Sequence, residues 1–299
     1  MSVPLEQRAA AGTARRYYES RRNRTLAGRM VVFLVLAAGS LLLLSPVWWM
    51  FATSVKSMEE IMAYPPTFWP NEFHFDNYVK AWTNPAAHFT RWLGNTAFIT
   101  LFVVIGNVIA NSFIAYGFAK IDFRGRHTLF SIVLATMMIP GFVTMIPQYI
   151  LFSKLGWMNS YLPLIVPAFF GSAFNIFLLR QFFMGISKDL VEAAKIDGAN
   201  HFYIWLRIAI PLAKPAIATI AIFSFNGAWN DFLGPLLYVN SESLYTLQIG
   251  LQTFKGTENT QWHYLMAASL LVLLPVILLF FFFQKYFIQG MDLTAGTKG

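Results

Sequence analysis

The sequence predicts an all-α polytopic membrane protein with six transmembrane helices. Hydrophobic residues make up 57% of the chain and charged residues only 12%, and the mean hydropathy is +0.52. Soluble domains carry about 25% charged residues, so a soluble chain of this composition would expose too much apolar surface. Six apolar runs reach the roughly 20 residues that a helix needs to cross a bilayer. Cysteine is absent, which excludes disulfides, thiolate metal sites and cysteine nucleophiles.

The first apolar run follows an arginine-rich start and shares features with a secretory signal. It ends in Pro46-Val47-Trp48-Trp49 without a small-residue cleavage site, so we expect it to be retained as a span. The six expected spans are 30–52, 93–117, 128–151, 161–183, 209–237 and 263–284. Together they form one membrane domain over 30–284, with a core at about 93–284, between a basic tail at 1–29 and a second tail at 285–299.

The distribution of basic residues predicts the orientation of these spans. Of the 22 Lys and Arg residues, 17 lie in the two tails and in the loops after the second and fourth spans, and 5 lie on the other side. The positive-inside rule therefore places both termini and the fourth loop in the cytoplasm. The basic tail has the charge to bind anionic lipid or RNA, but orientation alone explains it, and we expect no nucleic-acid partner.

The loop after the first span, 53–91, is too long for a minimal connection. It contains Pro65-Pro66 and Pro70 together with several aromatic residues. Since Trp and Tyr often mark the membrane interface, we expect part of this loop to lie on the outer surface.

The loop 187–207 is the most polar stretch between two apolar runs. Ser187 is a good N-cap, and Asp189 and Glu192 follow in the first turns, where the helix dipole favours anions. Asp197-Gly198 predicts a turn, and Asn200 can cap a second short helix. Two short helices of this kind suit docking of a soluble partner. The alternative is an amphipathic element resting on lipid, although its carboxylates would then face anionic headgroups.

The residue pattern of this loop resembles the EAA signature of the membrane subunits of ATP-binding-cassette (ABC) importers. Trp205 stands where Phe is usual in that signature, and Ile210 stands where Leu is usual before the proline. The matching residues are Glu192, Ala193, Ala194, Asp197, Gly198, Ala199, Trp205, Ile208, Pro211 and Pro215.

Three other segments, 156–161, 225–232 and 289–299, are similar to the carbohydrate-importer branch of this family, and to its smaller permease. The resemblance implies a type I ABC importer permease fold in the bacterial cytoplasmic (inner) membrane. It implies a subunit that forms half of the pathway for an oligosaccharide, sugar acid or related solute. The implied partners are a second permease in a heterodimer, two ABC ATPase subunits and an extracytoplasmic solute-binding protein. No cofactor is expected on this chain, because ATP and Mg would be bound by the ATPases.

The resemblance also implies roles for particular segments. The loop 187–207 would couple to the ATPases through the residues of the EAA pattern, chiefly Glu192 and Gly198, and the first span would pack against the second permease. The C-terminal tail would contact the ATPases through Gln289, Gly290, Thr294, Ala295 and Gly296. A loop before the sixth span would meet the binding protein through Gln252, Phe254, Gly256 and Asn259.

Polar residues within the apolar runs are candidates for the solute pathway, because such groups are costly in a membrane unless they face the bundle interior or water. The polar residues within or near the runs are Asn107, Asn111, Asn175, Asn226, Asn230 and Asp231. The candidate pathway residues are Asn226, Trp229, Asn230 and Asp231. Aromatic faces and amides suit sugar rings and hydroxyls. The alternatives are that the asparagines form interhelical hydrogen bonds and that Asp231 caps a helix or loop near the end of the fifth span.

Other functional classes lack their motifs. The sequence contains no H-E-x-x-H, no G-x-S-x-G and no phosphate-binding G-x-x-x-x-G-K-[ST], so we expect no enzyme and no ATPase activity in this chain. Two alternatives are an ion-gradient-driven secondary transporter, for which Asp231 is a modest candidate, and an ABC importer permease for a solute other than a sugar.

Overall fold

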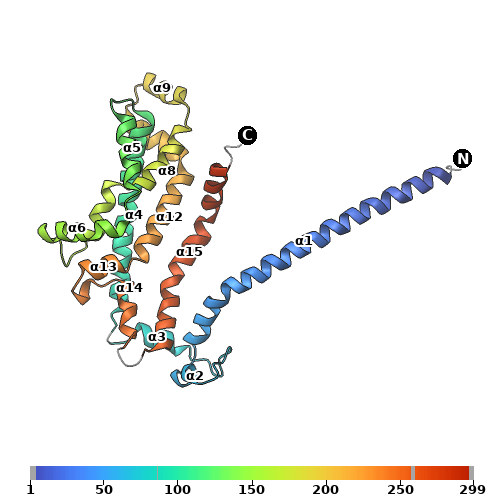
Figure 1. The fold of residues 1–299 in the computed structure, drawn as a ribbon, viewed down its shortest axis with the longest axis horizontal. Coiled ribbons are helices and arrows are strands. Elements are labelled where there is room, and N and C mark those ends of the chain that lie inside the picture. Colours follow the sequence, from blue (N-terminus) through green and yellow to red (C-terminus); the bar gives the residue numbers. More distant parts are fainter. Residues whose placement is uncertain (1–4, 86, 257–259, 296–299) are drawn as a thin grey trace.

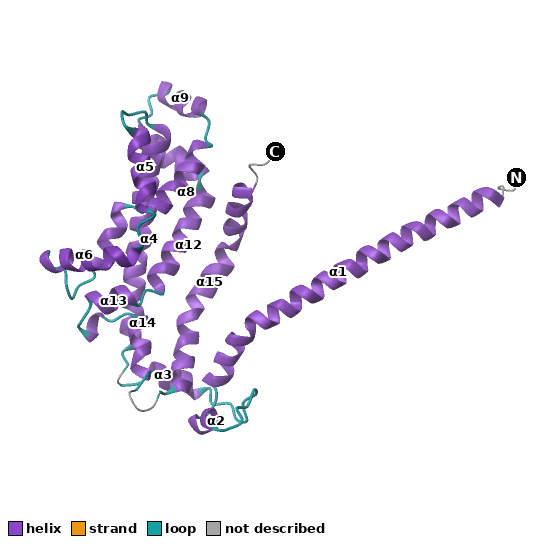
Figure 2. Ribbon diagram, in the orientation of Figure 1, coloured by secondary structure: helices purple, strands orange, loops and turns teal. Residues whose placement is uncertain are grey.

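The computed structural model describes the backbone of residues 5–85, 87–256 and 260–295, and the side chains of residues 28–85, 87–256 and 260–284. The described part is helical, with an isolated bridge between Lys255 and Thr260 in place of any sheet. This confirms the predicted all-α class (Figure 2). The longer helices are α1 (Leu5–Ser54), α4 (Phe89–Lys120), α5 (Arg126–Thr136), α6 (Gly141–Lys154), α8 (Ala173–Met184), α9 (Lys188–Ile196), α12 (Lys214–Trp229) and α15 (Trp262–Ala295).

Short helices connect the long ones at both ends of the bundle. Figure 1 shows α9 at one end of the bundle, here named the α9 end, and α3 at the opposite end, named the α3 end. The short elements are α2 (Met58–Met62), α3 (Asp76–Trp82), α7 (Leu162–Ile165), η1 (Val166–Phe170), α10 (His201–Ile204), η2 (Trp205–Ala209), α11 (Ile210–Leu212), α13 (Leu233–Tyr238), η3 (Glu242–Leu244), α14 (Leu247–Gly250) and η4 (Leu251–Phe254).

Among the described residues, four helical segments are long and apolar enough to cross a membrane, and two bent helix pairs bring the total to six if each pair is one span. The expected third span, 128–151, is not one straight helix, because α5 and α6 meet at 97°. Pro140 lies at the break; proline lacks an N–H and disfavours helical backbone in the residue before it. As a result α6 points away from the bundle (Figure 1).

The expected fifth span, 209–237, also differs from the structure. The segment His201–Leu212 and helix α12 meet at 84° around Ala213, and α12 ends at Trp229. Pro215 occupies the first turn of α12, where its missing N–H leaves no intrahelical bond unmade. The separate helix α13 begins at Leu233, so the last part of the predicted span does not continue α12.

Helix α4 is the centre of the bundle and packs against both α8 and α12. Two buried apolar clusters lie along it. The cluster towards the α9 end includes Tyr116, Leu179 and Trp205. The other, towards the α3 end, includes Phe89, Trp92, Trp229 and Phe254.

The first span departs from this bundle. Helix α1 extends away from the other helices (Figure 1), and its large apolar side chains between Met30 and Leu44 are exposed. Its last turns are held by the body: Ala52 and Ser54 are fully buried, and the Ser54 hydroxyl lies 2.8 Å from the hydroxyl of Tyr78. The helix is therefore anchored at one end and leaves a long apolar surface without a partner in the described chain.

Candidate functional site: a surface at the α9 end and a cavity within the bundle

The loop 187–207 folds into two short helices with the predicted caps. The Ser187 hydroxyl accepts a hydrogen bond from the backbone N–H of Leu190 at 3.1 Å, and the Asn200 side chain accepts one from Tyr203 N–H at 2.8 Å. Between the helices, Gly198 adopts a φ of +84°. That conformation is open to glycine and costly for other residues, so the turn depends on this glycine.

The loop has a buried base and an exposed outer side. Val191, Ile204 and Trp205 are buried in the cluster at the α9 end of α4. The outer side, which we name the α9 surface, presents Glu192, Ala193, Asp197, Gly198, Leu190, Ile196, Phe202 and Tyr203. A hollow of about 450 Å³ between α9 and α10 is lined by Ala194, Asp197, Gly198, Ala199, Asn200, Tyr203 and Ile208. Exposed apolar groups beside carboxylates are typical of a protein-docking surface.

Polar and aromatic contacts join this loop to the spans. The Tyr116 hydroxyl on α4 lies 3.2 Å from Nδ1 of His201 on α10. Lys120, also on α4, donates through its ammonium group to the carbonyl of Ile186, just before α9. The ring of Trp205 meets Phe113 edge to face, with centroids 5.3 Å apart. Both short helices are thus fixed to the last turns of α4.

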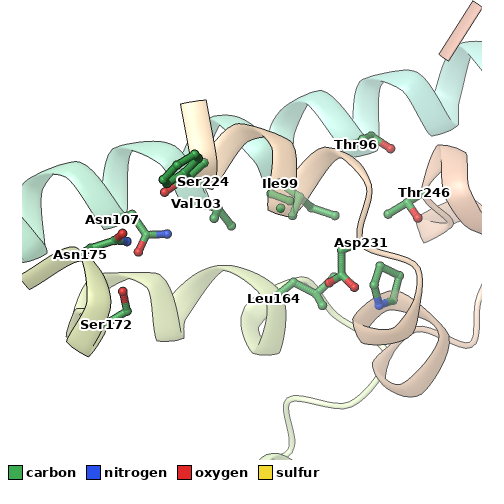
Figure 3. Close-up of a pocket in the computed structure, with 14 residues that line it drawn as sticks. Thr96, Ile99, Val103, Asn107, Leu164, Ser172, Asn175, Ser224, Asp231 and Thr246 are labelled. Atoms are coloured by element: carbon green, nitrogen blue, oxygen red, sulfur yellow. The ribbon is translucent and has the colours of Figure 1, made fainter. Parts of the chain in front are cut away.

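A cavity of about 400 Å³ lies between α4, α8 and α12. Figure 3 shows its polar lining. Thr96 and Asn107 come from α4, Ser172 and Asn175 from the start of α8, Ser224 from α12, and Asp231 and Thr246 from the segments that follow α12. Small-molecule sites in proteins have volumes of about 300–1,000 Å³, and this cavity falls within that range, although half of its lining residues are polar.

The polar groups near α8 are held by a buried asparagine. Asn111 is fully buried; its Oδ1 accepts from Ser172 N–H at 2.7 Å, and its Nδ2 donates to Asn107 Oδ1 at 3.1 Å. The oxygen of Asn107 is occupied in this way, and its amide nitrogen points into the cavity (Figure 3). At the other end of the cavity, Thr246 Oγ1 is buried without a hydrogen-bond partner among the described residues.

Asp231 is the single charged residue among the described residues that line this cavity. Its Oδ1 accepts from Gly234 N–H at 3.0 Å, which is the capping contact that the sequence offered as one alternative. Gly234 has no room for a side chain, because a Cβ there would lie 2.4 Å from Oδ2 of Asp231. Asp231 lies beyond the end of α12; burial raises the pKa of its carboxyl, and the N–H groups of Gly234 and Leu233 oppose that shift.

The other three predicted pathway residues do not line the cavity. Trp229 is buried against α15, where its Nε1 donates to the Val272 carbonyl at 3.0 Å. Asn226 on α12 and Asn230 just after it are exposed and form a hydrogen bond with each other, and the Gln248 amide donates to Asn230 Oδ1 at 3.3 Å. The sequence identified Asn107 and Asn175 only as amides within apolar runs. No pattern in the sequence marked Thr96 or Thr246 as residues of a cavity lining.

Comparison with known proteins identifies the family. Residues 103–293 match the family model described as "Binding-protein-dependent transport system inner membrane component". This match covers more than half of the chain. The chain is a member of that family of importer permeases. Its predicted fold as an ABC importer permease and its nature as a transport subunit rather than an enzyme are thereby confirmed, and the permease is a multi-pass inner-membrane protein.

Individual relatives agree. The arabinooligosaccharides transport system permease protein AraQ of Bacillus subtilis is 35% identical over 262 residues, and the match covers 87% of the present chain and 92% of AraQ. The sn-glycerol-3-phosphate transport system permease protein UgpE of Pectobacterium atrosepticum is 31% identical and covers 86% and 93%. A solved ABC transporter for import of the acidic polysaccharide alginate matches with a TM-score of 0.76 at 28% identity, covering 86% of the permease and 95% of that chain.

The predicted contact residues Gln252, Phe254 and Gly256 do not line the cavity. In the loop before α15, Gln252 and Gly256 are exposed, and Phe254 is buried with its ring stacked on Phe89 at 5.6 Å. Asn259 lies outside the described residues. In the predicted ATPase-contacting tail, Gln289, Gly290, Thr294 and Ala295 belong to the helical backbone of α15, and Gly296 lies outside the described residues.

Proposed function

We propose that the chain is the smaller permease of a carbohydrate importer and forms half of its translocation pathway. A second permease supplies the other half, a solute-binding protein delivers the solute from outside, and two ABC ATPases bind ATP and Mg. Relatives named for arabinooligosaccharide transport and for alginate import support a carbohydrate solute. A relative named for sn-glycerol-3-phosphate transport supports the alternative of a solute other than a sugar.

The observation that carries the coupling role is the combination of an exposed α9 surface with a buried base fixed to α4. Glu192 and Gly198 are exposed, while Val191 and Trp205 behind them are buried. In the proposed orientation, both termini and this surface are cytoplasmic, as the distribution of basic residues indicates. An ATPase that binds the α9 surface thereby contacts a unit that cannot move without α4.

Coupling follows from that connection. When the two ATPases close on ATP, their docking surfaces move, and the α9–α10 pair moves with them. The contact between Tyr116 and His201 and the bond from Lys120 to Ile186 pass this displacement to α4. Because α4 packs against α8 and α12, its movement changes the walls of the cavity and alternates access between the two sides of the membrane.

The exposed apolar surface of α1 supports the second permease as a partner. The side chains of Phe33 and Leu43 are 70% and 79% exposed. Lipid or another membrane subunit must cover them. We assign docking of the binding protein to the α3 end of the bundle, through the loop that contains Gln252, Gly256 and Asn259. The tail from Gln289 to Gly296 would contact the ATPases.

The experiment that tests this function is charge reversal at the α9 surface. The assay uses the complete complex, reconstituted in liposomes with its binding protein. Glu192→Lys should lower ATP-driven uptake about tenfold or more, because reversing a charge at a partly desolvated contact costs on the order of 1.4 kcal/mol or more. Basal ATP hydrolysis and membrane insertion should persist. Asp122→Lys, at an exposed carboxylate in the loop between α4 and α5, is the matched control and should transport normally. Normal uptake by Glu192→Lys would contradict the docking role.

A further inference from the structure

The charge pattern around the cavity is one-sided. Asp231 supplies a carboxylate, and the described residues of the lining include no Lys, Arg or His. The three helices that enclose the cavity carry their Lys and Arg residues away from it: Arg91 and Lys120 at the ends of α4, Arg180 in the second half of α8, and Lys214 at the start of α12. An anionic ligand in the cavity would therefore meet a carboxylate and no counter-charge from the described lining.

The hydrogen-bonding groups of the cavity suit an uncharged polyhydroxylated ligand. At one end, the amides of Asn107 and Asn175 offer N–H donors, and Asn107 is held in that orientation by Asn111. At the other end, the carboxylate of Asp231 offers acceptor oxygens, beside the buried and unpartnered hydroxyl of Thr246. A sugar hydroxyl both donates and accepts, so one neutral sugar can satisfy both ends.

We propose that this cavity binds one uncharged sugar unit of the transported solute and that Asp231 makes the subunit reject acidic sugars. The proposal rests on the proposed function and names the substrate class for it. It separates this permease from the structurally similar importer of acidic alginate. The carboxylate is held by Gly234, whose lack of a side chain leaves room for it, so Asp231 is a specificity-determining residue.

The test measures binding to the purified complex without its binding protein, so that the selectivity of that protein plays no part. Matched pairs of sugars that differ in one carboxylate serve as probes: glucose with glucuronate, and galactose with galacturonate. Binding is read as a saturable rise in melting temperature, because a ligand of the native state stabilises it by mass action. In the wild type, at least one neutral sugar should bind, and its acidic counterpart should require about tenfold or more higher concentration.

Three variants separate the roles. Asp231→Asn keeps an oxygen for Gly234 N–H and should bring the acidic and neutral sugars of a pair to similar affinity. Asn175→Ala should weaken binding of neutral sugars while keeping the discrimination of the wild type. Glu242→Gln removes a carboxylate outside the cavity lining and should change neither quantity.

Two results would overturn the proposal: failure of every neutral sugar to bind, or discrimination that survives in Asp231→Asn. Both are distinct from failure of the proposed function, which would appear as normal uptake in Glu192→Lys. The charge-reversal test does not involve the cavity, and the sugar-binding test does not involve the α9 surface.

Discussion

The Tyr116 hydroxyl on α4 and Nδ1 of His201 on α10 lie 3.2 Å apart, and their rings also meet, with centroids 6.1 Å apart. Tyr116 is buried, with an exposed fraction of 2%. The contact joins the start of the second short helix of the loop 187–207 to the last turns of the central span. It is a direct polar connection between the α9 surface and the bundle that encloses the cavity.

Replacing Tyr116 by Phe should uncouple the permease more than it destabilises it. The ring remains to fill the core, and the lost neutral hydrogen bond is worth about 0.5–1.5 kcal/mol. We expect a small drop in the melting temperature of the complex and a clear fall in solute transported per ATP hydrolysed. Tyr149→Phe is the matched control, because the Tyr149 side chain is exposed on α6, away from the α9 surface. Equal transport ratios in the two variants would show that this contact does not transmit motion.

Gly198→Ala should cost stability and coupling together. Gly198 has a φ of +84°, and a left-handed conformation costs a residue with a Cβ about 1–2 kcal/mol. No atom lies within 4 Å of the added Cβ, so the strain is in the backbone alone and is relieved by a shift of α10 relative to α9. The measurement is binding of the purified ATPase to the permease complex, with uptake as the second readout.

Gly125→Ala provides the control for this change. Gly125 has a φ of +85°, and a Cβ there also meets no atom within 4 Å. The two substitutions should therefore lower the free energy of unfolding by similar amounts. Only Gly198→Ala should weaken ATPase binding; equal losses in both variants would mean that backbone strain, and not the geometry of the α9 surface, is being measured.

Local signals in the sequence predicted the loop 187–207 well. Ser187 and Asn200 act as N-caps, and Gly198 forms the turn between them, because capping and positive φ depend on residues close in the chain. The number of apolar runs was likewise readable from hydropathy. The helix break at Pro140 was not predicted, because a hydropathy average counts a proline by its polarity and ignores the backbone hydrogen bond that proline removes from a helix.

The direction in which each side chain points from its helix was harder to predict. Trp229 was expected in the pathway because an aromatic face suits a sugar ring, but that reason does not tell in which direction the side chain points on its helix. Its contact with Val272 depends on where α15 packs, which no local pattern encodes. The cavity combines Thr96 with residues more than seventy positions later in the chain, so its lining follows from tertiary packing alone.

Gly250→Ala should destabilise the α3 end of the bundle through overpacking. An added Cβ would lie 2.1 Å from the ring of Trp92, which is fully buried. The ring also stacks edge to face on Phe89 at 5.2 Å and cannot move freely. Overpacking of a filled core costs about 1–3 kcal/mol, so the melting temperature of the complex should fall.

Gly94→Ala is the control for Gly250→Ala, and its effect should have the opposite sign. Gly94 lies in α4, one turn from the start of the helix, and a Cβ there meets no atom within 4 Å. Alanine exceeds glycine in helix propensity by about 1 kcal/mol, so this variant should be as stable as the wild type or more stable. A Gly250→Ala complex that melts at the wild-type temperature would show that Trp92 has room to move, contrary to the packing described for the cluster around Phe89 and Phe254.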